Sequence, residues 1–179
     1  MNTWIALLRG INVSGQKKIQ MSDLKAVFDS CDFSGVQTYI QSGNVVFVTK
    51  ESSRKKLIDK IEKSLQASFS YSIPVVLREA DTFTKAVEAH PWLKKKGIDP
   101  KAIYFSFARD VEGGKLKKVE ETSAVGDSYL TQGEQIYLYC PGGFGKTKFN
   151  NNYFEKKLGI VATTRNLNTC NKLINLAGV

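Results

Sequence analysis

The first half of the chain alternates between two hydrophobic periods, and these predict a β-α-β-β-α-β unit. Apolar residues at every second position, or in a short unbroken run, indicate strands, whereas a spacing of three or four indicates a helix. The expected helices follow N-caps at Ser22 and at Ser52 or Ser53. The expected strands are 3–9, 37–40, 44–49 and 73–78. This order is the split unit of ferredoxin-like folds.

The second half repeats much of this pattern after a helical linker that ends in the basic stretch WLKKKG. Its expected elements are a strand at 102–108, a helix at 115–124, a hairpin of 128–132 and 135–140, a helix at 149–158 and a last helix at about 166–177. The hairpin sequences TYIQSGNVVFV and SYLTQGEQIYL align, with Thr38 against Ser128. Such self-similarity indicates duplication, and a chance match of two amphipathic hairpins is the alternative.

Together these elements predict an α+β protein of two βαββα(β) units with antiparallel sheets and a C-terminal helix. The first unit, at 1–80, is expected to be ferredoxin-like, and a helical linker at 81–100 joins it to a second unit at 101–179. Several strands are apolar on both faces. Helices cover only one face of a split β-α-β unit, so the other face is expected to pack on the second half of the chain or on a second copy, as in a homodimer.

Composition narrows the class of protein. No apolar run approaches the roughly 20 residues that span a bilayer, and the N-terminal WIALL is too short for a signal core, so we expect a cytoplasmic protein without a membrane partner. Cys31, Cys140 and Cys170 lie far apart without a CxxC pair, and His90 is the single histidine. We therefore expect no disulfide framework, no metal site and no cofactor, and we expect His90 to lie at the surface or to cap a helix.

The charge balance favours an anionic partner. Lysine and arginine number 26 against 17 aspartate and glutamate residues, which gives a net charge of +9. Such an excess attracts nucleotides, nucleic acids and acidic proteins. The alternative is that the lysines only solvate helix faces, because many of them alternate with acids in stretches such as KLIDKIEKS.

The stretch PGGFGKTK at 141–148 lies between an expected strand and an expected helix, which is the order of a phosphate-binding loop. The nucleotide-triphosphate motif G-x-x-x-x-G-K-[ST] needs its first glycine at position 140, where Cys140 stands. A true NTPase loop is therefore not expected. Lys146 and Lys148 before a helix still favour an anion, and the alternative is a turn that needs glycine only for its shape.

Two further loops combine cations with amide groups. The end of the first strand is expected beside the start of the third, which brings RGINVSGQKK to the hairpin turn QSGN. The candidate residues at this rim are Arg9, Asn12, Lys17, Gln41, Ser42 and Asn44. Near the C-terminus, Arg165 and Asn166 open the last helix. A cation at a helix N-terminus is disfavoured without an anionic partner, which is either an internal carboxylate or a ligand.

Four motifs in order, RGINVSGQKKIQM, YIQSGNVVF, GKTK before a helix and LGIVATTRNLNTCNKL, resemble the bacterial family called domain of unknown function 1697. The resemblance covers essentially the whole chain. It implies an α+β protein with a ferredoxin-like N-terminal part, and it implies no established activity. Leu167 stands where an aromatic residue is common in the family, and Cys170 where a β-branched residue is common.

The leading hypothesis is a protein that binds a phosphate-bearing ligand, either a nucleotide or nucleic acid, through the three loops. A second hypothesis is an enzyme acting on a small phosphorylated or carboxylated metabolite, with Lys146 or Tyr39 as acid–base groups. A third is a self-association or protein-interaction module that presents an aromatic strip of Tyr104, Tyr137 and Tyr139.

Overall fold

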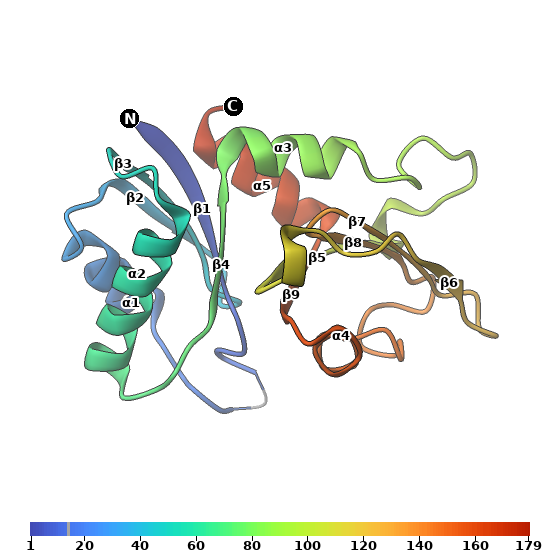
Figure 1. The fold of residues 1–179 in the computed structure, drawn as a ribbon, viewed down its shortest axis with the longest axis horizontal. Coiled ribbons are helices and arrows are strands. Elements are labelled where there is room, and N and C mark those ends of the chain that lie inside the picture. Colours follow the sequence, from blue (N-terminus) through green and yellow to red (C-terminus); the bar gives the residue numbers. More distant parts are fainter. Residues whose placement is uncertain (14) are drawn as a thin grey trace. The chain divides into compact units, whose positions relative to one another are not determined.

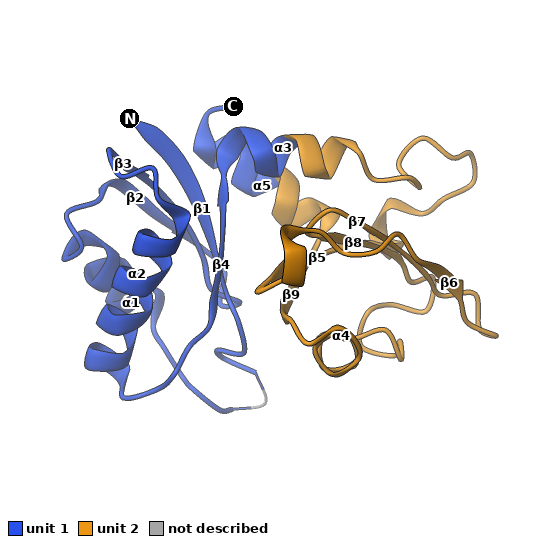
Figure 2. Ribbon diagram, in the orientation of Figure 1, with its two compact units in different colours: residues 1–84, 172–179 blue, residues 85–171 orange. Residues whose placement is uncertain are grey.

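The computed structural model describes residues 1–13 and 15–179, so Ser14 of the expected rim loop lies outside the described residues. In this part of the chain the fold is α+β, with two antiparallel sheets and five α-helices, the last of which is the C-terminal helix. The chain forms two compact units (Figure 2). Unit 1 contains residues 1–84 and 172–179, and unit 2 contains residues 85–171.

Unit 1 is built on a four-stranded antiparallel sheet in the order β2-β3-β1-β4. Its elements in chain order are β1 (Asn2–Leu8), α1 (Met21–Asp29), β2 (Ser34–Tyr39), β3 (Asn44–Thr49), α2 (Arg54–Phe69) and β4 (Val75–Glu79). This is the predicted β-α-β-β-α-β order, with strand boundaries that differ from the expected ones by up to three residues.

Helices α1 and α2 lie side by side on one face of this sheet (Figure 1). Alternate residues of β1 point into the core under them, because side chains on a strand alternate between faces. The core includes Trp4, Ala6, Leu8, Leu24, Phe28, Phe47, Leu57, Ile61, Leu65 and Leu77. Ile5 and Leu7, which alternate with these residues along β1, are also fully buried.

The N-caps predicted for α1 and α2 can be compared with the structure. Ser53 is the N-cap of α2 and its side chain accepts a backbone hydrogen bond from the first turn, as predicted. Ser22 is not the cap of α1, and that prediction is wrong. The Gln20 carbonyl already accepts a hydrogen bond from Leu24 N, so the helix begins at Met21 and Ser22 lies inside its first turn.

Unit 2 is built on a five-stranded antiparallel sheet in the order β6-β7-β8-β5-β9. Helix α3 (Ala80–Glu88) begins in unit 1 and ends in unit 2, and α5 (Leu167–Ala177) begins in unit 2 and ends in unit 1. The other elements are the 3₁₀ turns η1 (Pro100–Ala102) and η2 (Glu112–Gly114), β5 (Ile103–Arg109), β6 (Glu120–Thr122), β7 (Ser128–Gln132), β8 (Gln135–Tyr139), α4 (Asn151–Leu158) and β9 (Val161–Asn166).

The two sheets share a strand order. Strands β7-β8-β5-β9 follow one another as β2-β3-β1-β4 do, and every neighbouring pair is antiparallel. The hairpin turns differ in length, because Tyr39 pairs with Asn44 whereas Gln132 pairs with Gln135. An ungapped alignment of the two hairpins therefore cannot match both of their strands. The shared order agrees with duplication, which stays a prediction.

The helix expected at 115–124 is absent, and this prediction is wrong. The segment instead runs along the edge of β7 and contains the short strand β6. Leu116 N donates to Gly133 O at 2.7 Å, and Val119 N donates to Thr131 Oγ1 at 2.7 Å. Pairing with the open edge of a hairpin therefore outweighs the helical preference of a lysine-rich segment.

His90 is a core residue, so the surface or capping position expected for it is wrong. It is 2% exposed and lies edge-on against the rings of Phe105 and Tyr137, with centroids 4.6 and 5.0 Å away. Tyr137 is itself 2% exposed, so the expected aromatic strip of tyrosines is not an exposed one.

Candidate functional site

The hairpin turn at 40–43 is the part of the unit 1 rim that most constrains the sequence. Gly43 has a φ of 75°, and its carbonyl accepts a hydrogen bond from Leu8 N at 2.8 Å. A Cβ at this position would lie 2.6 Å from Ile11 Cδ1 and 2.9 Å from Leu8 Cβ. Only glycine fits, because the side chains of Ile11 and Leu8 occupy the space that a Cβ would need and because φ is positive.

Asn12 fastens the loop after β1 to this turn. Its Nδ2 donates to Gln41 O at 2.8 Å and to Ile19 O at 3.0 Å, and its Oδ1 accepts from Ile19 N at 2.8 Å. A contact of 3.3 Å joins Nδ2 to Gln41 Oε1. The Asn12 side chain is therefore engaged within the protein and fixes the shape of the rim.

Two other candidate side chains of the rim also bond internally. Asn44 is fully buried, and its Nδ2 donates to Tyr39 O at 2.8 Å and to Ser42 Oγ at 3.0 Å. Lys17 Nζ donates to Ser72 O at 2.7 Å and so ties the loop to the segment before β4. Ordinary structural bonding thus accounts for these groups without a ligand.

Unusual backbone conformations gather at the rim. Asn12, Lys17 and Ile40 all have positive φ, at 54°, 44° and 48°. Asparagine adopts this region readily, but it is strained for a β-branched residue such as Ile40, which is also 46% exposed. Strain of this kind persists where the surrounding bonds impose it, and it is enriched at ligand-binding sites.

An open groove of about 660 Å³ lies beside this fastened loop, within unit 1. It is lined by Asn12, Lys18, Ile19, Gln20, Met21, Ser22, Asp23, Gln41 and Phe69. Of the rim residues predicted from the sequence, it contains Asn12 and Gln41. Lys18 belongs to the rim loop RGINVSGQKK, whereas Gln20 and Ser22 were not among the predicted residues, although their place just before and inside the start of a helix was a usable signal.

The glycine-rich loop of unit 2 is a series of tight turns. Gly143 N donates to Cys140 O at 2.9 Å, and Lys146 N donates to Gly143 O at 3.1 Å. Phe144 packs against the ring of Tyr104 with centroids 5.4 Å apart. These backbone N–H groups are used within the loop, which favours the structural explanation of its glycines, while the Lys146 side chain is exposed.

Lys148, the second cation of this loop, joins an ionic cluster centred on Glu121. Glu121 accepts from Lys148 Nζ at 3.4 Å and from Lys157 Nζ at 2.9 Å. The hydroxyl groups of Tyr129 and Tyr153 donate to the same carboxylate at 3.0 and 3.3 Å. The pKa of Glu121 falls to about 2, chiefly through the bond from Lys157. Burial raises the pKa of Tyr129 to about 12, and the bond to Tyr129 raises that of Lys157.

Arg165 and Asn166 have local roles at the end of β9. The Arg165 side chain is 7% exposed, and its Nη1 donates to Thr163 Oγ1 at 2.9 Å and to Thr164 O at 2.8 Å. Asn166 Oδ1 accepts from Thr169 N, in the first turn of α5, at 2.8 Å. Arg165 lies in the strand before α5 rather than in the helix itself.

The ten predicted site residues thus fall in two units. Arg9, Asn12, Lys17, Gln41, Ser42 and Asn44 belong to unit 1, where the turn and the loop bring them to one rim; Lys146, Lys148, Arg165 and Asn166 belong to unit 2.

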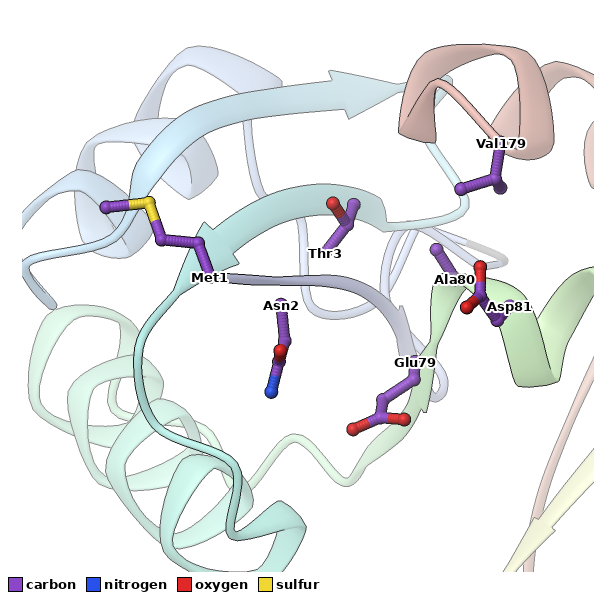
Figure 3. Close-up of a pocket in the computed structure, with 7 residues that line it drawn as sticks. All are labelled: Met1, Asn2, Thr3, Glu79, Ala80, Asp81 and Val179. Carbon is purple, nitrogen blue, oxygen red and sulfur yellow. The ribbon is translucent and has the colours of Figure 1, made fainter.

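A second cleft of unit 1, of about 220 Å³, lies where β1 begins and β4 ends (Figure 3). The side chains of Asn2 and Glu79 point to the same side of β1, and Asp81 also lines the cleft. Its carboxylates give it the wrong charge for an anion.

The fold and these sites define a class: an α+β protein of two sheet-based units whose described residues contain no cluster of three or more His, Cys, Asp or Glu side chains able to hold a metal ion. Among the described helices, none has the length and apolar character needed to cross a bilayer. The chain belongs to the family described as protein of unknown function, DUF1697, which matches residues 1–137. The family inferred from the sequence motifs is therefore confirmed, over a match that ends before GKTK and LGIVATTRNLNTCNKL.

A solved structure with the same fold is that of the conserved bacterial protein SP0830 from Streptococcus pneumoniae. It is 21% identical to this chain with a TM-score of 0.71, and the match covers 100% of this chain and 99% of that chain. At this identity the likeness establishes the fold alone. No curated protein matches the chain.

Proposed function

We propose that the protein binds a phosphate-bearing ligand of nucleotide size in the groove of unit 1. The observation that carries this proposal is the groove itself, whose walls are fixed by the bonds of Asn12 to the hairpin turn. A volume of about 660 Å³ suits a small ligand. Because the rim is fastened before any ligand arrives, little ordering is required on binding.

The residues that line the groove favour a negatively charged ligand. Lys18 is exposed there, and Gln20, Ser22 and Gln41 add groups that donate hydrogen bonds. The first turn of α1 adds the partial positive charge of a helix N-terminus. Asp23 is the one carboxylate among the lining residues, and its repulsion of a phosphate makes it a useful internal test.

Titration calorimetry with ATP, GTP and inorganic phosphate at low salt tests the proposal. Lys18→Glu should weaken nucleotide binding by about tenfold to a hundredfold, because a charge-assisted hydrogen bond is worth about 1.5–3 kcal/mol. Asp23→Asn should strengthen it. Lys55→Glu makes the same charge change on the exposed side of α2, outside the groove, and serves as the matched control.

Two outcomes would refute the proposal. One is the absence of nucleotide binding by the wild-type protein. The other is an equal loss of affinity in Lys18→Glu and Lys55→Glu, because net charge rather than the groove would then account for the binding.

A further inference from the structure

A run of exposed lysines in unit 2 lies outside the proposed groove. Lys94, Lys95 and Lys96 lie in the turns between α3 and η1, and Lys101 follows in η1. We call these four residues the lysine loop. All four are exposed, and none forms an ion pair with any residue that the structure describes.

Three of these lysines are consecutive, at 94–96, and none of the four has a carboxylate partner among the described residues. Elsewhere in the described chain, Lys25 pairs with Asp29 at 2.7 Å and Lys157 with Glu121 at 2.9 Å. The one carboxylate within 91–101 is Asp99, and it accepts a hydrogen bond from Lys101 N at 2.9 Å as the cap of η1. Like charges held together without acids repel one another, so the arrangement favours an external anion.

The backbone that carries the lysine loop is fixed on an aromatic base. Leu93 N donates to His90 O and Lys95 N donates to Trp92 O, both at 3.2 Å. Trp92 is 6% exposed and stacks on Tyr139, with ring centroids 6.3 Å apart and planes 17° apart. The ammonium group of Lys95 lies 5.4 Å from the centre of the Trp92 ring. The charges are therefore presented from a fixed segment rather than a loose tail.

The residues around the lysine loop indicate which kind of anionic partner it suits. Membrane insertion and protein interfaces both use exposed apolar or aromatic anchors. The large exposed apolar residues of unit 2 in the described chain are Val119 and Val125, which lie outside residues 90–101. Trp92 is buried, so it offers no ring face on which an unpaired base could stack. What remains is attraction between ammonium groups and phosphates, which is strongest where phosphates are densest.

We propose that the lysine loop binds the phosphate backbone of double-helical nucleic acid without reading its base sequence. Binding is governed by phosphate density, so a duplex binds more tightly than the same length of single strand. This inference does not rest on the groove of unit 1, and the two can fail separately.

Fluorescence anisotropy with duplexes of about 20 base pairs, longer than a typical single-strand site of about 4–16 nucleotides, tests the inference. DNA and RNA duplexes and a single strand are titrated with the full chain at several salt concentrations. The triple variant Lys94→Ala/Lys95→Ala/Lys96→Ala should bind at least about tenfold more weakly at low salt. Its plot of log K against log salt should be shallower by about 2–3, because each phosphate contact contributes a slope of about −0.9.

A matched control removes three charges elsewhere. Lys50→Ala/Lys55→Ala/Lys63→Ala removes exposed lysines just after β3 and on α2, and it lowers the net charge of +9 by the same amount. We expect it to retain nearly all of the affinity and the salt slope. Thermal unfolding of both variants shows whether each is folded, and nucleotide binding in the groove should survive in the loop variant.

The inference is overturned by any of four results. These are no duplex binding by the wild-type chain, equal losses in the two triple variants, tighter binding to the single strand than to the duplex, or tighter binding to phosphatidylserine vesicles than to the duplex at equal salt.

Discussion

Protonation of His90 is expected to destabilise the protein in mild acid. The ring is neutral in the fold: Nε2 donates to Tyr104 O at 3.1 Å, and Nδ1 accepts from Trp92 N at 3.4 Å. A proton added to Nδ1 would point at the Trp92 N–H, from which Nδ1 now accepts a hydrogen bond. Burial is the main cause that lowers the pKa of His90 from 6.5 to about 4.

The magnitude follows from linkage between protonation and folding. Above pH 6.5 the ring is neutral in both the folded and unfolded states, so its full contribution to stability is present. As the pH falls below 6.5 the unfolded chain takes up the proton first, and stability is lost until the folded pKa of about 4 is reached. The loss is about 2 kcal/mol at pH 5 and about 3 kcal/mol at pH 4, taking about 1.4 kcal/mol per pKa unit.

Urea unfolding across this pH range measures the loss, with His90→Gln as the comparison. Glutamine cannot take up a proton, so the variant should lack this part of the pH dependence, although it is less stable at neutral pH because ring contacts are lost. His90 is the single histidine, so one NMR titration follows it directly. A ring midpoint near 6.5, or the same pH dependence in both proteins, would refute the reasoning.

Three further predictions concern the rim and the ionic cluster. Gly43→Ala should destabilise the protein by about 2–4 kcal/mol in urea unfolding, because φ at this position is positive and because the added Cβ would clash with Ile11 Cδ1. Asn12→Ala should cost about 1–3 kcal/mol in the same assay, since the part-buried backbone groups of Ile19 and the exposed carbonyl of Gln41 lose partners. For either variant, a change below about 0.5 kcal/mol would contradict the structural role. Glu121→Gln should lower the melting temperature at neutral pH, with the difference vanishing as the pH falls toward 2. It should also lower the pKa of Tyr129 from about 12, measured by ultraviolet titration, and unchanged values would show that the cluster does not form.

The sequence predicted the parts of the fold in which local pattern and tertiary packing agree. The strand at Asn44–Thr49 was placed correctly because its unbroken apolar run suits a central strand buried on both faces. The helix at 115–124 failed because local apolar spacing does not show the open edge of β7, with which the segment pairs. Thr131 of the hairpin helps to hold the segment extended, since its hydroxyl accepts from Val119 N and donates to Lys117 O.

The candidate site was predictable as a place but not as a set of contacts. Strand order alone brings Asn12 and Gln41 to one rim, and the structure confirms that they meet. A sequence does not show whether an amide side chain bonds to the protein or to a ligand, and Asn44 proved to be buried and bonded internally. His90 was misjudged for a related reason, because nothing in its neighbours along the chain shows the rings that pack around it.

The positively charged side chains therefore fall into two groups, those bonded within the protein and those left exposed, and only the second group bears on ligand binding. Lys148 and Lys157 share the carboxylate of Glu121, and Lys17 bonds to a backbone carbonyl, so these cations help hold the protein together. Removing them would weaken both folding and binding and would tell little about a ligand. Lys18 in the groove and the lysine loop have no such internal partner in the described chain. Net charge alone does not identify a ligand site, but cations that the fold leaves exposed and uncompensated do mark where one can be tested.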